Sequence, residues 1–272
     1  MHSKVPSQEP PIEVPPLAAV SKRATITKQQ LVTWGPLAAI IGTVVIYFVS
    51  QFLGSVLLLS VAWLRGWNQS YINAWVQQVW PQFMYVALVE GTTLAMLAWF
   101  IRRRKAVWAA IGLVRPKLRD LAYTGLGIVI YFPLLIAAMT AVQNWLPHIN
   151  LDQPQQLGFS GAHGPALALV FISLCVLPPL TEEILVRGFL YSGLRSKLPK
   201  ITAALIASLM FAAAHLEFGQ NAPLLWSAAI DTFILSMVLI YLRERTGSLW
   251  ASIGLHTFKN TIAFAALFIF AK

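Results

Sequence analysis

The sequence predicts an all-α protein, a polytopic transmembrane bundle of about seven spans. Hydrophobic residues make up 57% of the 272 residues and charged residues only 11%, whereas a soluble domain carries roughly a quarter charged residues. No charged residue occurs between Lys28 and Arg65, and this stretch exceeds the roughly 20 residues that cross a bilayer. The apolar segments are long, which favours helices over the short alternating segments of a membrane β-barrel.

The chain divides into three regions. Residues 1–30 combine prolines with polar residues and contain no apolar run, so we expect a disordered cytoplasmic tail. Residues 31–145 hold the N-terminal transmembrane helices, and residues 165–272 hold the last four. The expected spans lie in 29–64, 79–101, 121–142, from 166 through 183, 201–217, 224–242 and 249–271.

Lysine and arginine predict the orientation. The formal net charge is +10, and an N-terminus in the cytoplasm puts sixteen of the twenty basic residues on the cytoplasmic side, as the positive-inside rule requires. The basic excess is therefore a topology signal, so we expect a lipid bilayer as partner and no nucleic acid. We expect an integral protein of a bacterial plasma membrane, with a photosynthetic internal membrane as the alternative.

Eight ionisable residues fall within or at the ends of the predicted spans, where burial in the membrane costs each a few kcal/mol. Such residues are retained for pairing or for function. They are Glu90, Glu182, Glu183, Arg187, His215, Asp231, His256 and Lys259.

Three of these residues are predicted to lie at similar depth. Glu182 precedes the turn at 197–200 by 15 residues and His215 follows it by 15, so both lie about 22 Å from that turn along antiparallel helices. His256 lies 11 residues past Arg245, about 16 Å from the same membrane surface. Helix tilt can absorb the difference, so three helices are expected to bring these side chains together.

Two ion pairs are also predicted. Glu183 and Arg187 are four residues apart and share a helix face. Asp231 and Lys259 lie about 18 and 21 Å from the cytoplasmic ends of their helices, which are similar depths. Each pair would neutralise a charge inside the membrane.

Two prolines precede the glutamates. Pro178 and Pro179 are expected to break the helix at this point. Thr181 would then cap the segment that restarts.

Three short motifs occur in order along the last four spans. They are Glu182-Glu183-x-x-x-Arg187, Phe211-x-x-x-His215 and His256-x-x-x-Asn260. Together they resemble the motifs of the CAAX-processing and bacteriocin-processing family of intramembrane proteases, and so does Arg245-Thr246-Gly247-Ser248-Leu249. The resemblance extends from about Pro165 to Asn260.

The resemblance implies an intramembrane endopeptidase whose catalytic core is residues 165–272. Family members cleave prenylated CAAX proteins or take part in bacteriocin processing and immunity, which implies a membrane-associated protein or peptide as substrate. It also implies that the Glu183–Arg187 ion pair supports the site.

The same resemblance implies a role for each remaining motif residue. Glu182 would activate the attacking water, and His215 would position that water or ligate a metal. His256 and Asn260 would stabilise the oxyanion or share in metal ligation.

The residue types suit this chemistry. A carboxylate in apolar surroundings is a stronger proton acceptor, as a general base requires, and imidazole and carboxamide groups can donate to an oxyanion. Two histidines and one glutamate can also hold Zn²⁺ with an open coordination position. The sequence is compatible with both metal-dependent and metal-free activation of water.

Other functions are weighed against this one. A non-catalytic scaffold or a bacteriocin-immunity protein could retain the motifs as a polar network, and an ion-coupled transporter could use the same carboxylates. Gly158-Phe159-Ser160-Gly161 resembles the GxSG of rhomboid serine proteases but lies in a polar outer loop. The chain has neither HExxH nor GxGD, and its single cysteine, Cys175, excludes a disulfide framework.

Overall fold

The computed structural model describes residues 32–152, 158–216 and 225–270. These residues form helices and connecting turns with no strand, and this confirms the predicted polytopic helical bundle. The predicted tail at 1–30 lies outside the described residues. Within these described ranges, six helices are long and apolar enough to cross a membrane. They are α1 (Pro36–Leu64), α3 (Val79–Arg103), α4 (Leu118–Trp145), a continuous helix from Ala166 to Arg195, α9 (Trp226–Thr246) and the helix Trp250–Phe270, which begins with α10 (Trp250–Phe264).

The fifth of the seven expected spans is a shorter helix in the structure. The sequence predicts a span over 201–217, and the structure has α8 (Lys200–Ala213), which is 14 residues long. Such a helix extends about 21 Å, less than the roughly 30 Å of the hydrocarbon core.

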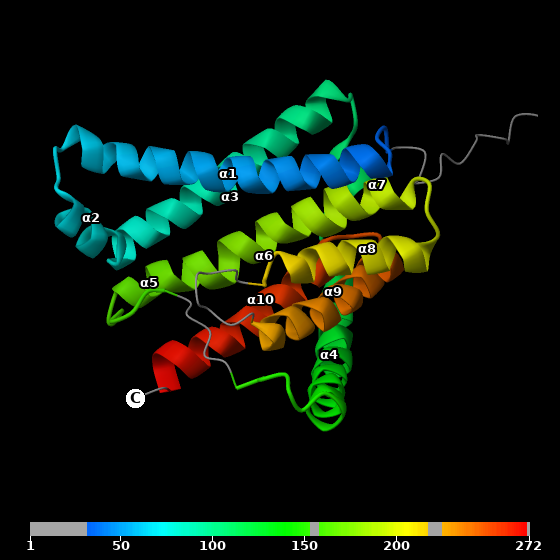
Figure 1. Ribbon diagram of the computed structural model, residues 1–272. Coiled ribbons are helices and arrows are strands. Elements are labelled where there is room, and N and C mark those ends of the chain that lie inside the picture. The colour runs from blue at the N-terminus through cyan, green and yellow to red at the C-terminus, as the bar shows by residue number, and fades with distance from the viewer. Residues whose placement is uncertain (1–31, 153–157, 217–224, 271–272) are drawn as a thin grey trace, which may run out of the picture.

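The helices form two groups around the continuous helix Ala166–Arg195 (Figure 1). On one side, α1 packs along α3, and the short α2 (Gln69–Val76) joins them. On the other side lie α8, α9 and α10, and α4 packs against α9 and α10. The central helix therefore contacts both groups, so a site on it can draw residues from the N-terminal and C-terminal spans.

The central helix is not broken at its prolines, so that prediction was wrong. It consists of α5 (Ala166–Phe171), a π-helical turn (Ile172–Val176), α6 (Leu177–Glu182), a second π-helical segment (Glu183–Leu190) and α7 (Tyr191–Arg195). Proline lacks the N–H that an α-helix requires, and the π turn directly upstream accommodates this loss, as π-bulges do near functional sites. Thr181 lies inside α6 and caps nothing; its hydroxyl is buried without a hydrogen-bond partner among the described residues.

Polar and aromatic contacts fix α1 and α3 to the centre of the bundle. Thr93 Oγ1 on α3 donates to Ser50 Oγ on α1 at 2.9 Å, a bond of the kind that joins helices in membranes. Trp34, just before α1, stacks on Phe189 and donates its Nε1–H to the Phe189 carbonyl at 3.1 Å. The N-terminal helices are thus held against the π-helical segment that follows Glu182.

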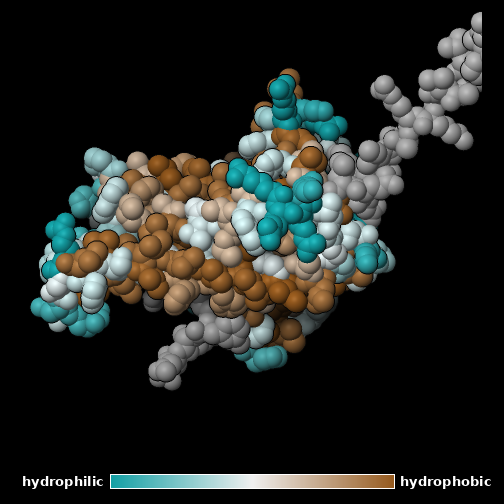
Figure 2. All heavy atoms as spheres, turned by 90° about the horizontal axis from the view of Figure 1, so that it is seen from above, coloured by the Kyte–Doolittle hydropathy of each residue, from teal (hydrophilic) through white to brown (hydrophobic). Residues whose placement is uncertain are grey.

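The outer surface is apolar. Leu37, Phe48 and Phe52 on α1 are 70%, 64% and 66% exposed, which would be costly in water. Figure 2 shows large hydrophobic areas on the face seen from above, with hydrophilic residues gathered at one narrow end and on the opposite, wider half. The spans and this surface identify an integral membrane protein.

The predicted Asp231–Lys259 ion pair is confirmed. Lys259 Nζ lies 2.8 Å from Asp231 Oδ2, and the Tyr131 hydroxyl donates to Asp231 Oδ1. The three residues come from α10, α9 and α4, so one neutral cluster ties three helices together. Tyr131 could not be assigned to this cluster from the sequence, because a tyrosine in an apolar helix does not indicate which residue it will bind.

Candidate active site

Glu182 and His215 line a single cavity of about 540 Å³. Its wall combines side chains from α1, α3, the central helix and α8. Glu182 and His215 therefore lie near each other, as their similar predicted depths indicated. The N-terminal helices α1 and α3 also contribute residues to the cavity. The polar lining residues are Thr43, Tyr47, Ser50, Gln51, Glu90, Thr93, Thr181, Glu182 and His215.

The Glu182 carboxylate is only partly engaged. Its Oε2 is buried without a hydrogen-bond partner among the described residues, and it lies 3.8 Å from His256 Nε2. That distance is too long for a hydrogen bond. The Glu182 side chain is 28% exposed, so one face of it reaches the cavity. Through this exposed face the carboxylate can accept a proton from a molecule that enters.

Glu183 is the next residue, but its side chain does not line the cavity. Its side chain and that of Arg187 are both fully buried, and Arg187 Nη1 lies 2.9 Å from Glu183 Oε1. His256 Nδ1 contacts the same oxygen at 3.0 Å. The predicted Glu183–Arg187 ion pair is confirmed, and it extends to His256.

His256 therefore lies between the two glutamates. When Nδ1 donates to Glu183, the neutral imidazole presents Nε2 as an acceptor toward Glu182. A proton that reaches Nε2 would instead be shared with Glu182. The buried pair thus fixes both the position and the orientation of the imidazole.

Phe211 links the buried pair to His215. The Arg187 guanidinium carbon lies 4.2 Å from the centre of the Phe211 ring, a cation–π distance. The Phe211 ring is 4.6 Å from the His215 ring, and its carbonyl oxygen lies 2.8 Å from His215 Nδ1. This bond, with Nδ1 as donor, leaves Nε2 of a neutral His215 free to accept or exchange a proton.

Asn260 has a different environment. Its Nδ2 donates to the Leu174 carbonyl at 2.9 Å, and it is absent from the residues that line the cavity. Leu174 lies four residues before Pro178, whose missing N–H would otherwise bond that carbonyl. Asn260 thus satisfies a backbone acceptor that the proline leaves unpaired.

The cavity includes residues that sequence reasoning did not assign to the site. Tyr47 and Gln51 on α1 and Glu90 on α3 line it, and Tyr85 donates to Gln51. Glu90 could have been suspected, because an ionisable residue in a span is a functional signal. The residues of α1 carry no such signal.

The described residues do not form the ligand set that zinc needs. No group of three or more His, Cys, Asp or Glu side chains in 32–152, 158–216 and 225–270 is arranged to hold a metal ion. The candidate zinc ligands predicted from the sequence are Glu182, His215 and His256. In this geometry His256 Nδ1 is already used by Glu183.

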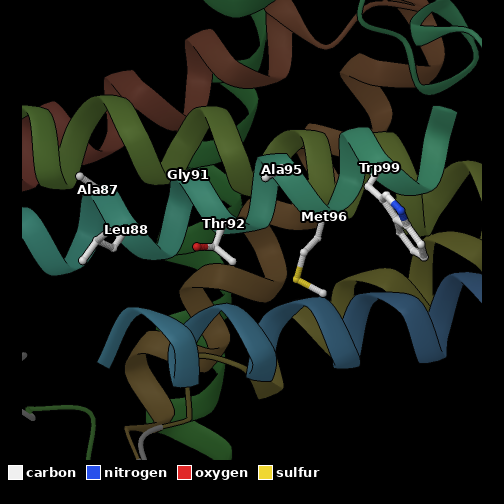
Figure 3. A pocket seen from close by; sticks show the side chains of 7 residues that line it. All are labelled: Ala87, Leu88, Gly91, Thr92, Ala95, Met96 and Trp99. Carbon is white, nitrogen blue, oxygen red and sulfur yellow. The ribbon is translucent and has the colours of Figure 1, made fainter. Parts of the chain in front are cut away.

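A second depression, on the surface of α3, has no catalytic groups. All seven residues that line it come from this one helix (Figure 3), and none of them is ionisable. It therefore offers no acid or base. The lining residues are Ala87, Leu88, Gly91, Thr92, Ala95, Met96 and Trp99.

Comparison with known proteins supports the reading of the motifs. Residues 164–262 match the family model described as type II CAAX prenyl endopeptidase Rce1-like, and the resemblance predicted from the motifs is confirmed over this range. An Escherichia coli protein described as an uncharacterized 24.3 kDa protein is 26% identical over 223 residues, which cover 78% of this chain and 95% of that protein. No solved structure matches.

Proposed function

We propose that this protein is an intramembrane endopeptidase whose general base is Glu182. Residues 164–262 match the family model described as type II CAAX prenyl endopeptidase Rce1-like, and this match supports a CAAX-protease type of function in the membrane. The observation that carries the assignment to Glu182 is that its side chain, which is 28% exposed, lines the cavity that His215 also lines. The neighbouring Glu183 is fully buried and already accepts from Arg187 and His256.

The reaction needs one water and one peptide carbonyl in the cavity. Glu182 takes a proton from the water, whose oxygen attacks the carbonyl carbon. His215 can stabilise the charge that develops on the carbonyl oxygen in its imidazolium form, in which Nε2–H donates to that oxygen while Nδ1–H donates to the Phe211 carbonyl. The tetrahedral intermediate collapses when the peptide C–N bond breaks, and the proton held by Glu182 passes to the leaving amine.

The buried cluster of Glu183, Arg187 and His256 positions the base. His256 Nε2 lies 3.8 Å from Glu182 Oε2, so the imidazole packs beside the carboxylate and limits the positions that it can adopt. The Glu183–Arg187 pair holds the imidazole from behind. Neither member of the pair is exposed, so we assign both a positioning role.

No step is assigned to a metal, because the described residues lack a three-ligand set. If Zn²⁺ binds after a rearrangement, Glu182, His215 and His256 would hold it and the metal would polarise water. Treatment of the purified protein with a chelator tests this possibility. Loss of activity that added Zn²⁺ restores would replace metal-free activation with a metal-dependent mechanism.

We infer that the substrate is a membrane-associated protein or peptide. The cavity lies among apolar spans and is lined by Val44, Phe48 and Met210 beside its polar groups. Prenylated CAAX-type substrates follow from the family. The distribution of Lys and Arg supports a cytoplasmic N-terminus, and a bacterial plasma membrane is the proposed location.

The decisive experiment compares the parent with Glu182→Gln in cells, at equal amounts of folded protein. Asp152→Asn makes the same chemical change at an exposed position of the outer loop and serves as the matched control. We expect the N- and C-termini of some membrane proteins to disappear in Glu182→Gln alone. Identical termini, with a deletion phenotype that both proteins rescue, would instead establish a non-catalytic scaffold.

A further inference from the structure

A third cavity, of about 460 Å³, lies at the end of the bundle where α7 and α9 end and α4 begins. Arg195 on its wall is 13 residues beyond Glu182, about 20 Å along the central helix. The cavity is thus separate from the candidate active site. It lies at the end that carries most of the basic residues.

The lining of this cavity is strongly basic. Arg119, Arg195, Arg243 and Arg245 line it together with one carboxylate, Glu244. Glu244 is already engaged, since Tyr191 donates to it at 3.0 Å and Arg195 Nε lies 3.4 Å away, while Lys200 Nζ lies 3.8 Å from its second oxygen. Four arginines against one glutamate leave a formal excess of three positive charges.

Arg243 is the central group of the cavity. Its residue is only 9% exposed, and its Nε is buried without a hydrogen-bond partner among the described residues. A buried guanidinium with an unpaired donor is costly, and the charge of an anion in the cavity would offset that cost. Gly112, which has φ +83°, leaves the space that the guanidinium occupies, because a Cβ at this position would collide with it.

Backbone carbonyls hold two of the other arginines in place. Arg119 Nη2 donates to the Thr246 carbonyl at 2.7 Å, and Arg195 Nη1 donates to the Leu198 carbonyl at 3.0 Å. Arg245, Thr246 and Gly247 form part of this wall, and Thr246 Oγ1 donates to the Leu242 carbonyl at 2.8 Å. The basic groups are therefore ordered before any ligand arrives.

We propose that this cavity binds a phosphate-type oxyanion, either the headgroup phosphate of an anionic lipid or a free phosphate ion. Planar guanidinium groups match the oxygens of a phosphate and bind them in pairs. Basic pockets between transmembrane helices at the cytoplasmic side bind lipid headgroups of this kind. The site is independent of proteolysis, so the peptidase assignment can fail while this site stands.

The test uses the full chain, purified in a neutral detergent. Phosphatidylglycerol, phosphatidylcholine and inorganic phosphate are titrated separately, and the unfolding temperature and the lipid retained in native mass spectrometry are measured. A ligand that binds only the folded state raises the unfolding temperature. We expect phosphatidylglycerol to do so, phosphatidylcholine not to, and added salt to weaken the effect.

Variants connect the effect to the cavity. Arg243→Gln should weaken binding about tenfold or more, because a charge-assisted pair is lost, and Arg243→Lys should recover only part of it. Arg245→Gln is an exposed alternative if Arg243→Gln does not fold. Arg103→Gln, at the exposed end of α3, removes the same charge elsewhere and should bind as the parent does.

Three outcomes decide the proposal. Competition between inorganic phosphate and phosphatidylglycerol supports a lipid headgroup phosphate as ligand. Stabilisation by inorganic phosphate alone supports a soluble anion at the same site. No stabilisation by either probe, or equal stabilisation in Arg245→Gln, Arg103→Gln and the parent, overturns the proposal.

Discussion

Two clusters of ionisable residues inside the bundle differ in one respect. In the Asp231 cluster each carboxylate oxygen has a partner, because Lys259 contacts one and Tyr131 the other. In the Glu182 cluster two carboxylate oxygens, Glu182 Oε2 and Glu183 Oε2, have no hydrogen-bond partner among the described residues. The Asp231 cluster is closed and stabilises the fold, whereas the Glu182 cluster is open, because the Glu182 side chain lines a cavity. Charge in a membrane therefore does not by itself identify a catalytic site, but a carboxylate that reaches a cavity does point to one.

The largest expected effect is on activity, at the open cluster. Glu182→Gln keeps the size of the side chain but removes its ability to accept a proton. We expect the rate of peptide cleavage to fall by about 10² to 10⁴-fold, with little change in thermal stability. The measurement is cleavage of a substrate found by terminal profiling, beside the unfolding temperature. Undiminished cleavage would exclude Glu182 as the base.

The next largest effect is on stability, in the buried pair behind the site. Arg187→Met leaves Glu183 without its cation in a fully buried position. Breaking a buried pair from one side costs about 3–5 kcal/mol, so we expect a large drop in the unfolding temperature in detergent. The double variant Glu183→Gln with Arg187→Met should recover part of the loss, because no charge then remains unpaired. If the single variant is as stable as the parent, the pair does not support the fold.

A smaller loss of stability is expected at the closed cluster. Lys259→Met leaves Asp231 with Tyr131 as its remaining partner. Because Lys259 and Asp231 are 21% and 15% exposed, water can compensate partly, and we expect a loss of about 1–3 kcal/mol. Cleavage activity, once normalised to folded protein, should be unchanged. A melting curve identical to that of the parent would show that the ion pair contributes nothing.

The smallest effect is expected at Asn260. Asn260→Ala removes the donor to the Leu174 carbonyl, and hydrogen bonds between helices in membranes contribute about 0.6 kcal/mol on average. We therefore expect a slight loss of stability and a modest loss of activity. If cleavage instead falls as far as in Glu182→Gln at equal stability, Asn260 contacts the reacting groups during catalysis. That result would restore the role that the family resemblance implies.

The sequence predicted the features that depend on local spacing. Glu183 and Arg187 pair because four residues bring side chains to one helix face. The shared depth of Glu182 and His215, and that of Asp231 and Lys259, follows from the rise per residue in helices with a fixed cytoplasmic end. The continuity of the central helix could not be predicted. It depends on a π turn upstream and on Asn260, which lies more than eighty residues away along the chain.

The sequence by itself determined that the chain spans a membrane, since the cost of placing charge and free backbone groups in lipid forces long apolar helices. It also determined which residues could perform acid–base chemistry. Only the tertiary structure decided which of two adjacent glutamates is open. Glu183 meets Arg187 and His256, whereas Glu182 faces the cavity that α1, α3 and α8 complete. The spacing of four residues specifies the Glu183–Arg187 pair, but His256 and the walls of the cavity come from helices distant in sequence, so neither composition nor spacing could specify them.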